Sequence, residues 1–369
     1  MKNLIILSYD FPPQDGGIAR LCQEIAVGQE RYFKKVTVLT TNRKGNSYTY
    51  NYTEIDRIEF LEDRIKCEYE ILKYFRSISD KSEYVVLTAT WHPEGLLGVL
   101  SGFKNIFFLA HGTELLSGDS NFRKRIWLPL YCKFLLNKAK AVIANSNYTK
   151  RLVTNIQPRA NVLALPLAVN EMFFKPLENR KNSEKFIICT VSRIEKFKGH
   201  DFIANVLANL PFKIKEKIQW NIAGKGPDLQ YLVELVKKLN LNKNVSFKGF
   251  ISDEQLPMFY AQSDVFILCS RESKSSIAVE GFGLVFLEAQ ACGIPTIGTN
   301  TGGIPDAIEH GNGGFLIDQD NEHQLTEILL NLFNNPAVLD EQKVKARNRV
   351  LNGFTWNHYN ENLFNILNK

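Results

Sequence analysis

The sequence EGFGLVFLEAQACGIP, from Glu280 to Pro295, is the most informative stretch of the chain. Its glycines precede a predicted helix of about two turns, which Gly293 and Pro295 end. Glu280 lies in the glycine loop, and Glu288 lies in the first turn of this predicted helix. Backbone amides at a helix start can bind phosphate oxygens, and a nearby carboxylate can accept hydrogen bonds from sugar hydroxyls. The alternative is that both glutamates only stabilise the helix dipole. That would account for Glu288, but not for the glycine-rich loop that leads into the helix.

On both sides of this stretch, short apolar runs alternate with helical stretches. Continuous apolar strands that alternate with helices are typical of parallel sheets covered on both faces. The sequence therefore predicts an α/β chain with doubly wound sheets. The clearest helices are predicted over 229–239 and 324–332, with another over 19–26. The predicted strands cover 4–7, 36–40, 84–87, 106–109, 141–144 and 162–165 in the first half, and 186–191, 218–223, 245–247, 265–268, 296–298 and 315–317 in the second.

The length of 369 residues is too great for one core and suits two domains. The most polar break between the two sets of strands is the segment 170–185, where we place the linker. We therefore expect two doubly wound, Rossmann-like domains of similar size, over 1–170 and 171–350. Ligands of such sheets bind beyond the carboxyl ends of the strands, so the cleft between the two domains is the expected active site.

The composition excludes several classes of protein. With 44% hydrophobic and 23% charged residues, the chain is globular rather than disordered, collagen-like or stapled by disulfides. No apolar run approaches the roughly 20 residues that a membrane-spanning helix needs, and the apolar run at the N-terminus is too short for a signal peptide. The six cysteines include no Cys-x-x-Cys pair, so the sequence predicts neither a zinc site nor a disulfide framework. We expect a reduced, cytoplasmic protein.

Two further turns follow predicted strands. The first, PPQDGG from Pro12 to Gly17, comes before a helix, and its glycines would let the backbone approach an anion at the helix start. Its spacing does not match the dinucleotide fingerprint, and an ordinary strand–helix turn is the alternative. The second turn holds Arg193 and Lys198 after the strand 186–191, where converging cations suit a diphosphate. A solvated basic loop is the alternative there.

The net charge of +6 comes from one segment. Residues 120–170 contain nine Lys and Arg and no Asp or Glu, and subtracting nine from +6 leaves the remainder of the chain at −3. Within this segment, 122–138 combines cations with Trp127, Tyr131 and many aliphatic residues, which suits a helix lying on an anionic lipid surface. Pro129 interrupts it and its apolar residues form no clean stripe, so a helix packed on its own sheet with a basic edge is the alternative. Nucleic-acid binding is not expected, because the aromatic residues lie among aliphatic ones.

Taken together, these motifs resemble the retaining glycosyltransferases of family 4, which have the GT-B architecture of two Rossmann-like domains facing across a cleft. Glu280 and Glu288 match the two-glutamate motif of that family. The resemblance covers essentially the whole chain, and its first motif and the 280–295 block look most like the bacterial phosphatidylinositol mannosyltransferase branch. The matching motifs, in chain order, are PPQDGG at 12–17, HGTE at 111–114, NSNYT at 145–149, Arg193 with Lys198, GKGP at 224–227 and the 280–295 block.

The resemblance implies a role for each matching residue. Arg193 and Lys198 would neutralise the β-phosphate as the leaving group departs. Glu280 would bind hydroxyls of the transferred sugar, and Glu288 would hold the nucleoside ribose. His111 would reach the donor sugar from the acceptor side, although a lone histidine is more often structural. The residues expected to pack against the nucleotide sugar are Gly16, Gly17, Gly224, Phe282, Gly283, Leu284 and Val285.

The activity that the resemblance implies is transfer of a hexose, mannose favoured, from GDP-mannose or a UDP-sugar to a hydroxyl of a lipid-linked or glycan acceptor. Such transfers serve the synthesis of cell-envelope polysaccharide or glycolipid. No carboxylate is placed as a nucleophile, so front-side departure with retention of the anomeric configuration is implied. The alternatives are a UDP-sugar transferase acting on a soluble glycan or small molecule, and a non-catalytic nucleotide-sugar binding protein. The expected partners are the donor, the acceptor and an anionic membrane surface, with no cofactor, metal or nucleic acid.

Three features fit the family pattern less directly. Asn170 replaces a common Asp, and the stretch 271–278, which borders the donor-sugar loop, is rich in serine and charge. Asp318 and Asp320 have the Asp-x-Asp spacing of a metal site in the other glycosyltransferase architecture, but two acids after an exposed strand are commonly solvated. The C-terminal helix, over 351–369, is expected to return to the first domain, as it does in this family.

Overall fold

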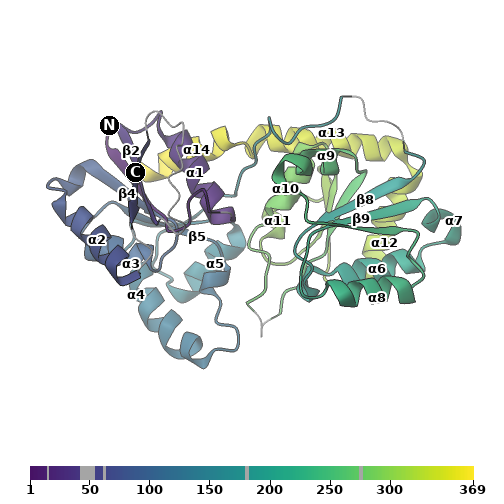
Figure 1. The fold of residues 1–369 in the computed structure, drawn as a ribbon, viewed down its shortest axis with the longest axis horizontal. Helices are drawn as coiled ribbons and strands as arrows, with labels where there is room; N and C mark the ends of the chain where they lie inside the picture. The colour runs from purple at the N-terminus through teal and green to yellow at the C-terminus, as the bar shows by residue number, and fades with distance from the viewer. Residues whose placement is uncertain (15, 42–54, 61–63, 179–182, 274–276) are drawn as a thin grey trace. The chain divides into compact units, whose positions relative to one another are not determined.

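The computed structural model describes residues 1–14, 16–41, 55–60, 64–178, 183–273 and 277–369. By internal packing the chain divides into two compact units (Figure 1). The first unit consists of Met1–Leu165 and Trp356–Lys369, and the second unit consists of Pro166–Thr355. The linker expected over 170–185 thus begins inside the second unit.

The first unit contains a parallel sheet of seven strands in the order β3-β2-β1-β4-β5-β6-β7. Continuous apolar runs form its central strands, and Leu4 to Leu7 are fully buried because helices cover both faces of the sheet. The strands are β1 (Asn3–Leu7), β2 (Lys35–Thr41), β3 (Ile55–Phe60), β4 (Tyr84–Thr88), β5 (Ile106–Ala110), β6 (Ala141–Ala144) and β7 (Val162–Ala164).

Among the strands that the structure describes, β3 is the one that the sequence patterns do not predict. Its sequence, IDRIEF, mixes charged and apolar residues, and it pairs with β2 at the edge of the sheet. An edge strand is not enclosed by a neighbour on each side, so it does not need the continuous apolar run that marks a central strand.

Helices connect the strands of the first unit. The four-residue α4 continues directly from the π-helix η3, so that the two form one helical segment. The helices are α1 (Gly17–Gln29), α2 (Arg64–Ser77), η1 (Lys81–Glu83), α3 (Glu94–Leu100), η2 (Thr113–Leu115), η3 (Arg123–Cys132), α4 (Lys133–Leu136), α5 (Asn147–Ile156) and α14 (Trp356–Leu367).

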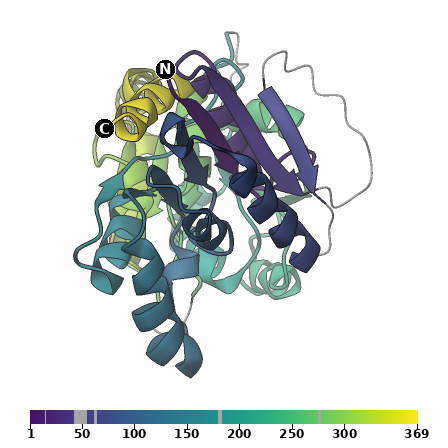
Figure 2. The same ribbon diagram turned by 90° about the vertical axis from the view of Figure 1, so that its left-hand side faces the viewer.

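The C-terminal helix α14 packs on α1 in the first unit, and Figure 2 shows it in yellow beside the start of the chain. The Gln29 side-chain amide donates to both oxygens of Asn360, at 2.8 and 2.9 Å. Tyr32 stacks on Phe364 with ring centroids 4.6 Å apart. A Cβ at Gly28 would collide with Asn360, so the close approach of these helices requires glycine there.

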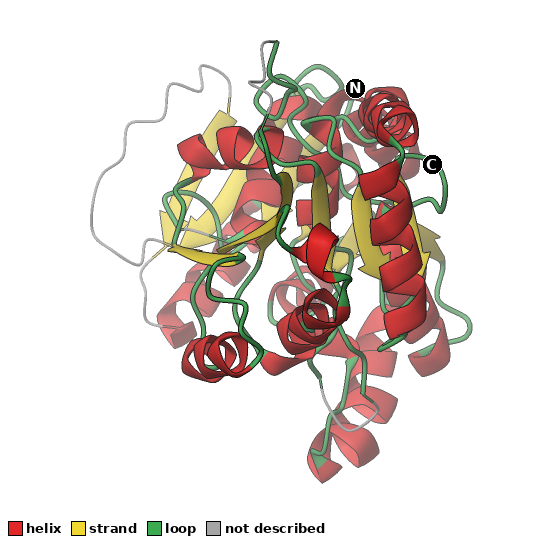
Figure 3. Ribbon diagram, turned by 90° about the vertical axis from the view of Figure 1, so that its right-hand side faces the viewer, coloured by secondary structure: helices red, strands yellow, loops and turns green. Residues whose placement is uncertain are grey.

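The second unit contains a parallel sheet of six strands in the order β10-β9-β8-β11-β12-β13, with helices on both sides of it (Figure 3). The strands are β8 (Phe186–Val191), β9 (Ile218–Ala223), β10 (Val245–Gly249), β11 (Val265–Leu268), β12 (Thr296–Thr299) and β13 (Gly314–Ile317). The helices are η4 (Lys196–Lys198), α6 (His200–Asn209), α7 (Phe212–Lys215), α8 (Leu229–Lys238), η5 (Asp253–Gln255), α9 (Leu256–Ala261), α10 (Leu284–Ala291), α11 (Ile304–Ala307), α12 (Glu322–Asn334) and α13 (Pro336–Gly353).

Alternate residues of each central strand enter different cores. Ile188 of β8 joins a core with residues of α6, α8 and α12, whereas Cys189 joins a core with residues of α9, α10 and α11. All the strands predicted from the sequence are present, and the predicted doubly wound α/β fold is confirmed.

Each sheet has one place where the strand order reverses direction. It lies between β1 and β4 in the first unit, and between β8 and β11 in the second. Loops that leave two such neighbouring strands diverge to opposite faces, which opens a crevice at the carboxyl edge of the sheet. The candidate ligand sites therefore lie beyond Leu7 and Thr88, and beyond Val191 and Leu268.

Candidate functional site

In the second unit, the two predicted motifs that carry charge meet at the carboxyl edge of the sheet. Lys198 Nζ donates to Glu280 Oε2 at 2.6 Å, although the two residues are 82 positions apart in the sequence. The side chains are only 14% and 17% exposed, so solvent screens this ion pair less than a surface pair. The structure thus places one cation and one carboxylate side by side, as a site for a charged and hydroxylated ligand requires.

Close backbone packing fixes the turn that carries Lys198. The turn is η4, and Gly199 ends it with a left-handed φ of 75°. A Cβ at Gly199 would lie 2.0 Å from the carbonyl oxygen of Cys269, the residue that follows β11. Glycine therefore allows this turn to lie directly against the end of the neighbouring strand.

The glycine loop leads from Glu280 into α10. Gly283 is the N-cap of α10, with φ 89° and no side-chain cap. The amides of Leu284 and Val285, in the first turn, have no acceptor within their own helix. Phe282 is buried, and its side chain packs in the core beside α9, α10 and α11. The helix start predicted from the sequence is confirmed, with a carboxylate directly before it.

Two glycines that the sequence analysis missed hold this loop in place. Gly303 N donates to Glu280 O at 2.8 Å, and a Cβ at Gly303 would lie 2.0 Å from Gly281 O. A Cβ at Gly302 would lie 2.5 Å from Glu280 O. The available signal was the Thr-Gly-Gly sequence at 301–303, one residue after β12 at the same edge of the sheet.

Gly224 has a comparable packing role behind the other loop. A Cβ added at Gly224 would lie 1.9 Å from the carbonyl oxygen of Ser192, and the Gly224 amide donates to Gly249 O at 2.7 Å. The GKGP motif therefore packs against the backbone that leads from β8 to Lys198.

Arg193 lies apart from the Lys198–Glu280 pair. Its side chain is 77% exposed, and its guanidinium pairs with Glu195 at 2.7 Å. The structure therefore brings one of the two predicted cations to the carboxylate and leaves the other at the surface of the same loop.

Glu288 lies deeper than predicted. It is the fifth residue of α10, so its expected place in the first turn is wrong by about one turn. The side chain is buried, and its Oε2 accepts a hydrogen bond from the Tyr260 hydroxyl at 2.8 Å. Burial and the adjacent carboxylate raise the pKa of Tyr260 well above its ordinary value, so the phenol remains a donor. No sequence signal linked Tyr260 to this helix.

In the first unit, His111 directly follows β5 and is held by three contacts. Its ring Nε2 lies 2.7 Å from the carbonyl oxygen of Ala89, to which it donates. Its backbone amide donates to Glu114 Oε1 at 2.6 Å, and Asn145 Nδ2 donates to its carbonyl oxygen at 3.2 Å. These contacts fix the HGTE turn and engage the Nε2 atom of the ring with the protein backbone.

The glycines at the start of α1 are in open surroundings. Gly16 is the N-cap of α1 and Gly17 its first residue, and a Cβ at either would have no atom of another described segment within 4 Å. No packing contact in the described part of the chain therefore requires glycine at 17. The contact of these glycines with a nucleotide sugar stays a prediction, and the free space leaves room for it.

A buried carboxyl group that the sequence analysis missed lies at the same edge. Glu94, in the first turn of α3, accepts hydrogen bonds from the Tyr9 amide and the Thr90 hydroxyl. Burial raises the pKa of Glu94 above its ordinary value. Glu94 thereby links the loops that follow β1 and β4, the strands that flank the crevice of the first unit.

The Asp-x-Asp motif of the second unit is engaged in protein contacts. Asp320 accepts from Arg271 at 2.7 Å, and Asp318 accepts from the Gln324 side chain at 3.3 Å. Among the residues that the structure describes, no group of three or more His, Cys, Asp or Glu is arranged to hold a metal ion.

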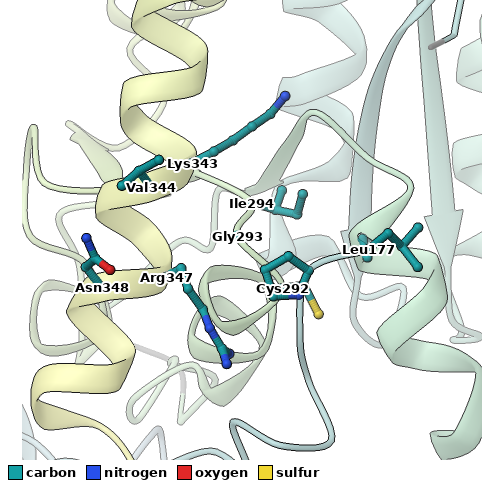
Figure 4. Close-up of a pocket in the computed structure, with 10 residues that line it drawn as sticks. Leu177, Cys292, Gly293, Ile294, Lys343, Val344, Arg347 and Asn348 are labelled. Atoms are coloured by element: carbon teal, nitrogen blue, oxygen red, sulfur yellow. The ribbon is translucent and has the colours of Figure 1, made fainter. Parts of the chain in front are cut away.

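A cavity of about 390 Å³ lies at the far end of α10 from the glycine loop (Figure 4). It is mainly apolar, and Cys292, Ile294 and Arg347 are among its lining residues. The Arg347 guanidinium donates to backbone carbonyl groups, including that of Ala291 at 2.7 Å. The cavity contains none of the predicted site residues and lies near the amino ends of β11 and β12, away from the edge where ligands bind.

The basic segment of the first unit has two different faces. Leu128, Cys132, Leu135 and Leu136 are buried in the core. Four large apolar side chains face solvent instead: Phe122 is 57% exposed, Ile126 50%, Leu130 64% and Phe134 54%. The cations Lys124, Arg125, Lys133 and Lys138 are also exposed. Arg123 differs from them, because its guanidinium donates to the carbonyl oxygens of Glu114 and Leu116 at 2.7 and 2.9 Å.

Comparison with known proteins assigns the family. The profile of the glycosyl transferases group 1 matches residues 173–349, and that of Glycosyltransferase Family 4 matches residues 15–171. A GDP-mannose-dependent alpha-(1-6)-phosphatidylinositol monomannoside mannosyltransferase from Mycolicibacterium smegmatis is 26% identical over 96% of this chain and 95% of that protein. The monoacylated-substrate counterpart from Corynebacterium glutamicum is 22% identical over 99% of this chain and 98% of that protein.

Solved structures share the fold. The Anabaena protein HepE in complex with UDP and glucose superimposes with a TM-score of 0.76 at 18% identity, with all of both chains covered. Sucrose-phosphate synthase from Thermosynechococcus elongatus gives a TM-score of 0.77 at 19% identity, with 99% of this chain and 98% of that chain covered. The predicted resemblance and the GT-B fold are confirmed, and the chain belongs to the family 4 glycosyltransferases.

Proposed function

We propose that this glycosyltransferase is a retaining, metal-independent hexosyltransferase. It transfers a hexose, mannose favoured, from a nucleotide sugar to a hydroxyl of a lipid-linked or glycan acceptor. The observation that carries the proposal is the shielded Lys198–Glu280 pair, which lies directly before the uncapped start of α10. The mannosyltransferases of Mycolicibacterium and Corynebacterium among its relatives support mannose and a glycolipid acceptor.

The donor diphosphate binds at the carboxyl edge of the second unit. Lys198 meets the β-phosphate, and the first amides of α10 donate to phosphate oxygens. Glu280 accepts hydrogen bonds from the hydroxyls of the hexose. The donor therefore replaces the direct ion pair: Lys198 exchanges its carboxylate partner for phosphate, and Glu280 exchanges its cation for hydroxyl groups.

The reaction proceeds on one face of the sugar. The bond between the anomeric carbon and the β-phosphate oxygen breaks, and that oxygen keeps the electron pair. The acceptor hydroxyl oxygen bonds to the same carbon from the same side, and its proton passes to the departing phosphate. Lys198 stabilises the negative charge that develops on the leaving group, and Arg193, on the same loop, supplies a second cation. Two protein cations make a metal ion unnecessary for this charge.

Glu288 holds the nucleoside ribose, oriented by the Tyr260 hydroxyl. Gly16 and Gly17 of the first unit provide the open backbone against which the diphosphate packs, and His111 binds the transferred sugar. These assignments follow the family pattern, residue by residue.

The acceptor is proposed to lie at an anionic lipid surface, on which the first unit rests. No helix in the described ranges is both long and apolar enough to span a bilayer. One helical segment instead has a half-exposed apolar face, flanked by exposed cations. This face consists of Phe122, Ile126, Leu130 and Phe134. This combination is typical of a helix that lies in the headgroup region.

Donor binding and transfer are tested separately. GDP-mannose, UDP-glucose and the free diphosphates GDP and UDP are screened by thermal shift, because a ligand of the folded state raises the melting temperature. Transfer to an extracted lipid acceptor is then followed in excess chelator, and the anomeric configuration of the product is read by NMR. We expect one nucleotide class to stabilise the protein, transfer to persist with chelator, and the product to keep the donor configuration.

Three results would contradict the proposal. An inverted product excludes the retaining mechanism, and loss of transfer with chelator that manganese restores excludes metal independence. Stabilisation by a nucleotide sugar without transfer to any lipid, glycan or small-molecule acceptor identifies a binding protein instead of an enzyme.

A further inference from the structure

The Asp-x-Asp motif and the serine-rich stretch, both left unexplained by the sequence, meet through Arg271. Its Nε lies 2.7 Å from Asp320 Oδ1, and its Nη1 lies 2.8 Å from Asp201 Oδ1. The Arg271 side chain is about three-quarters buried, so two carboxylates hold one guanidinium in a fixed position.

Arg271 also donates hydrogen bonds to the turn that carries Lys198. Its Nη1 donates to the carbonyl oxygen of Lys196 at 3.2 Å, and its backbone amide donates to the carbonyl oxygen of Phe197 at 2.6 Å. Both carbonyl groups belong to η4, which ends at Lys198. The position of this turn therefore depends on where Asp320 and Asp201 hold the guanidinium.

A second line of contacts runs from the same motif to Glu280. Gln319 Oε1 accepts from the Glu272 amide at 2.9 Å, and Glu272 Oε2 accepts from Gly302 N at 3.2 Å. The next residue, Gly303, donates its amide to Glu280 O. Residues 319–320 thus contact the residues that hold Lys198 and Glu280 in place, and they do not contact Lys198 or Glu280 directly.

We propose that Asp320 and Arg271 are positioning residues for donor binding. They form a buttress, made of residues 271–272 and 319–320, that sets the distance between Lys198 and the diphosphate. The inference rests on the proposed role of Lys198 at the β-phosphate. It assigns the Asp-x-Asp motif to support of the phosphate site instead of to metal binding.

The backbone of Asp320 allows a clean test. Its φ is 56°, in the left-handed region, which Asn and Asp tolerate better than other residues. Asp320→Asn therefore removes the charge and keeps an acceptor without straining the backbone. Asp318→Asn is the matched control, because the Asp318 carboxylate lies in the same motif and accepts from the Gln324 side-chain amide, outside the buttress.

The measurement is calorimetric affinity for a nucleoside diphosphate and for the monophosphate of the same base. GDP with GMP, or UDP with UMP, is used according to which diphosphate binds the wild type. Asp320→Asn is expected to weaken the diphosphate about 5- to 10-fold, the usual size of an effect transmitted through another residue. The monophosphate lacks the β-phosphate that Lys198 meets, so its affinity is expected to stay unchanged. Asp318→Asn is expected to change neither.

A double-mutant cycle with Lys198→Ala separates positioning from general loosening. If Asp320 acts through Lys198, the double variant binds the diphosphate no more weakly than Lys198→Ala alone. Additive losses, equal losses of mono- and diphosphate, or no loss in Asp320→Asn would overturn the buttress while leaving the phosphate site in place. An unchanged diphosphate affinity in Lys198→Ala, or no binding by the wild type, would overturn the proposed donor site and the buttress together.

Discussion

The carboxyl edges of the two sheets use glycine for different reasons. In the second unit, Gly199, Gly224 and Gly303 each lie where a Cβ would come within about 2 Å of a neighbouring carbonyl oxygen. In the first unit, a Cβ at Gly16 or Gly17 would have no atom of another segment within 4 Å, as far as the chain is described. The second edge is therefore packed backbone against backbone around a formed ion pair, whereas the first edge has room at the helix start. A phosphate site gains from fixed charges, and free space is what an approaching ligand requires.

Lys198→Ala tests the fixed charge of the second unit and has the largest expected effect. Removing a group that stabilises a leaving phosphate lowers turnover by about 100-fold or more. Steady-state transfer from the nucleotide sugar measures the loss. Lys196→Ala is the matched control, because Lys196 lies in the same turn with its side chain exposed. Equal turnover in both variants would mean that the cation of the site lies elsewhere.

Replacing Lys124, Arg125 and Lys133 together with Ser tests the surface of the first unit. Each cation near an anionic membrane contributes about 1 kcal/mol, so binding to vesicles that contain phosphatidylglycerol should fall about 100-fold. Arg123 stays in place, because it supports the HGTE turn through two carbonyl groups. Flotation at low salt measures the binding.

The control for this variant is its affinity for the nucleoside diphosphate. Diphosphate affinity should remain that of the wild type, because none of the three cations belongs to the second unit, where we propose that the donor diphosphate binds. Wild-type protein that does not float at low salt would show that the segment is an ordinary basic edge.

Two alanine substitutions test the difference between the glycines directly. Gly303→Ala should destabilise the protein by about 2 kcal/mol or more, because the added carbon collides with the Gly281 carbonyl oxygen. Gly17→Ala should leave the melting temperature unchanged or raise it slightly, because alanine favours a helix. If the donor packs against Gly17, Gly17→Ala also raises the KM for the donor without lowering the melting temperature. If the Gly17→Ala variant is destabilised, or the Gly303→Ala variant is as stable as the wild type, the contrast between open and packed glycines is wrong.

The two glutamates should fail in different ways, with effects of about tenfold. Glu288→Gln should weaken nucleotide binding, because a ribose contact exists in the ground state and the transition state alike. Glu280→Gln should mainly lower the catalytic rate, because the proposed role of Glu280 is to orient the sugar as charge develops. Diphosphate affinity should not fall in Glu280→Gln, since the change also frees Lys198 from its carboxylate partner. Matching losses of affinity in both would show that the pair is misassigned.

The sequence predicted the strands well because most of them are continuous apolar runs. It missed β3 because IDRIEF mixes charged and apolar residues, which the edge of a sheet permits. The start of α10 was predictable from Gly283, a local signal. The burial of Glu288 was not predictable, because its hydrogen-bond donor, Tyr260, lies 28 residues away in the sequence.

Contacts between distant segments explain the remaining differences. The Lys198–Glu280 pair and the Asp320–Arg271 contact join loops from different strands, so no spacing within one motif could predict them. The segment 122–138 showed no clean stripe because both of its faces are apolar. Only burial separates Leu128 and Leu135, in the core, from Ile126 and Leu130, at the surface.

The central claim is that Lys198 meets the β-phosphate of the donor, and phosphorus NMR of the bound nucleoside diphosphate tests it most directly. The α- and β-phosphorus resonances are compared between wild type and Lys198→Ala, both saturated with the diphosphate that binds. The account predicts that the β resonance of the bound nucleotide shifts on substitution while the α resonance stays in place. Unchanged resonances, or a change confined to the α-phosphorus, would contradict it.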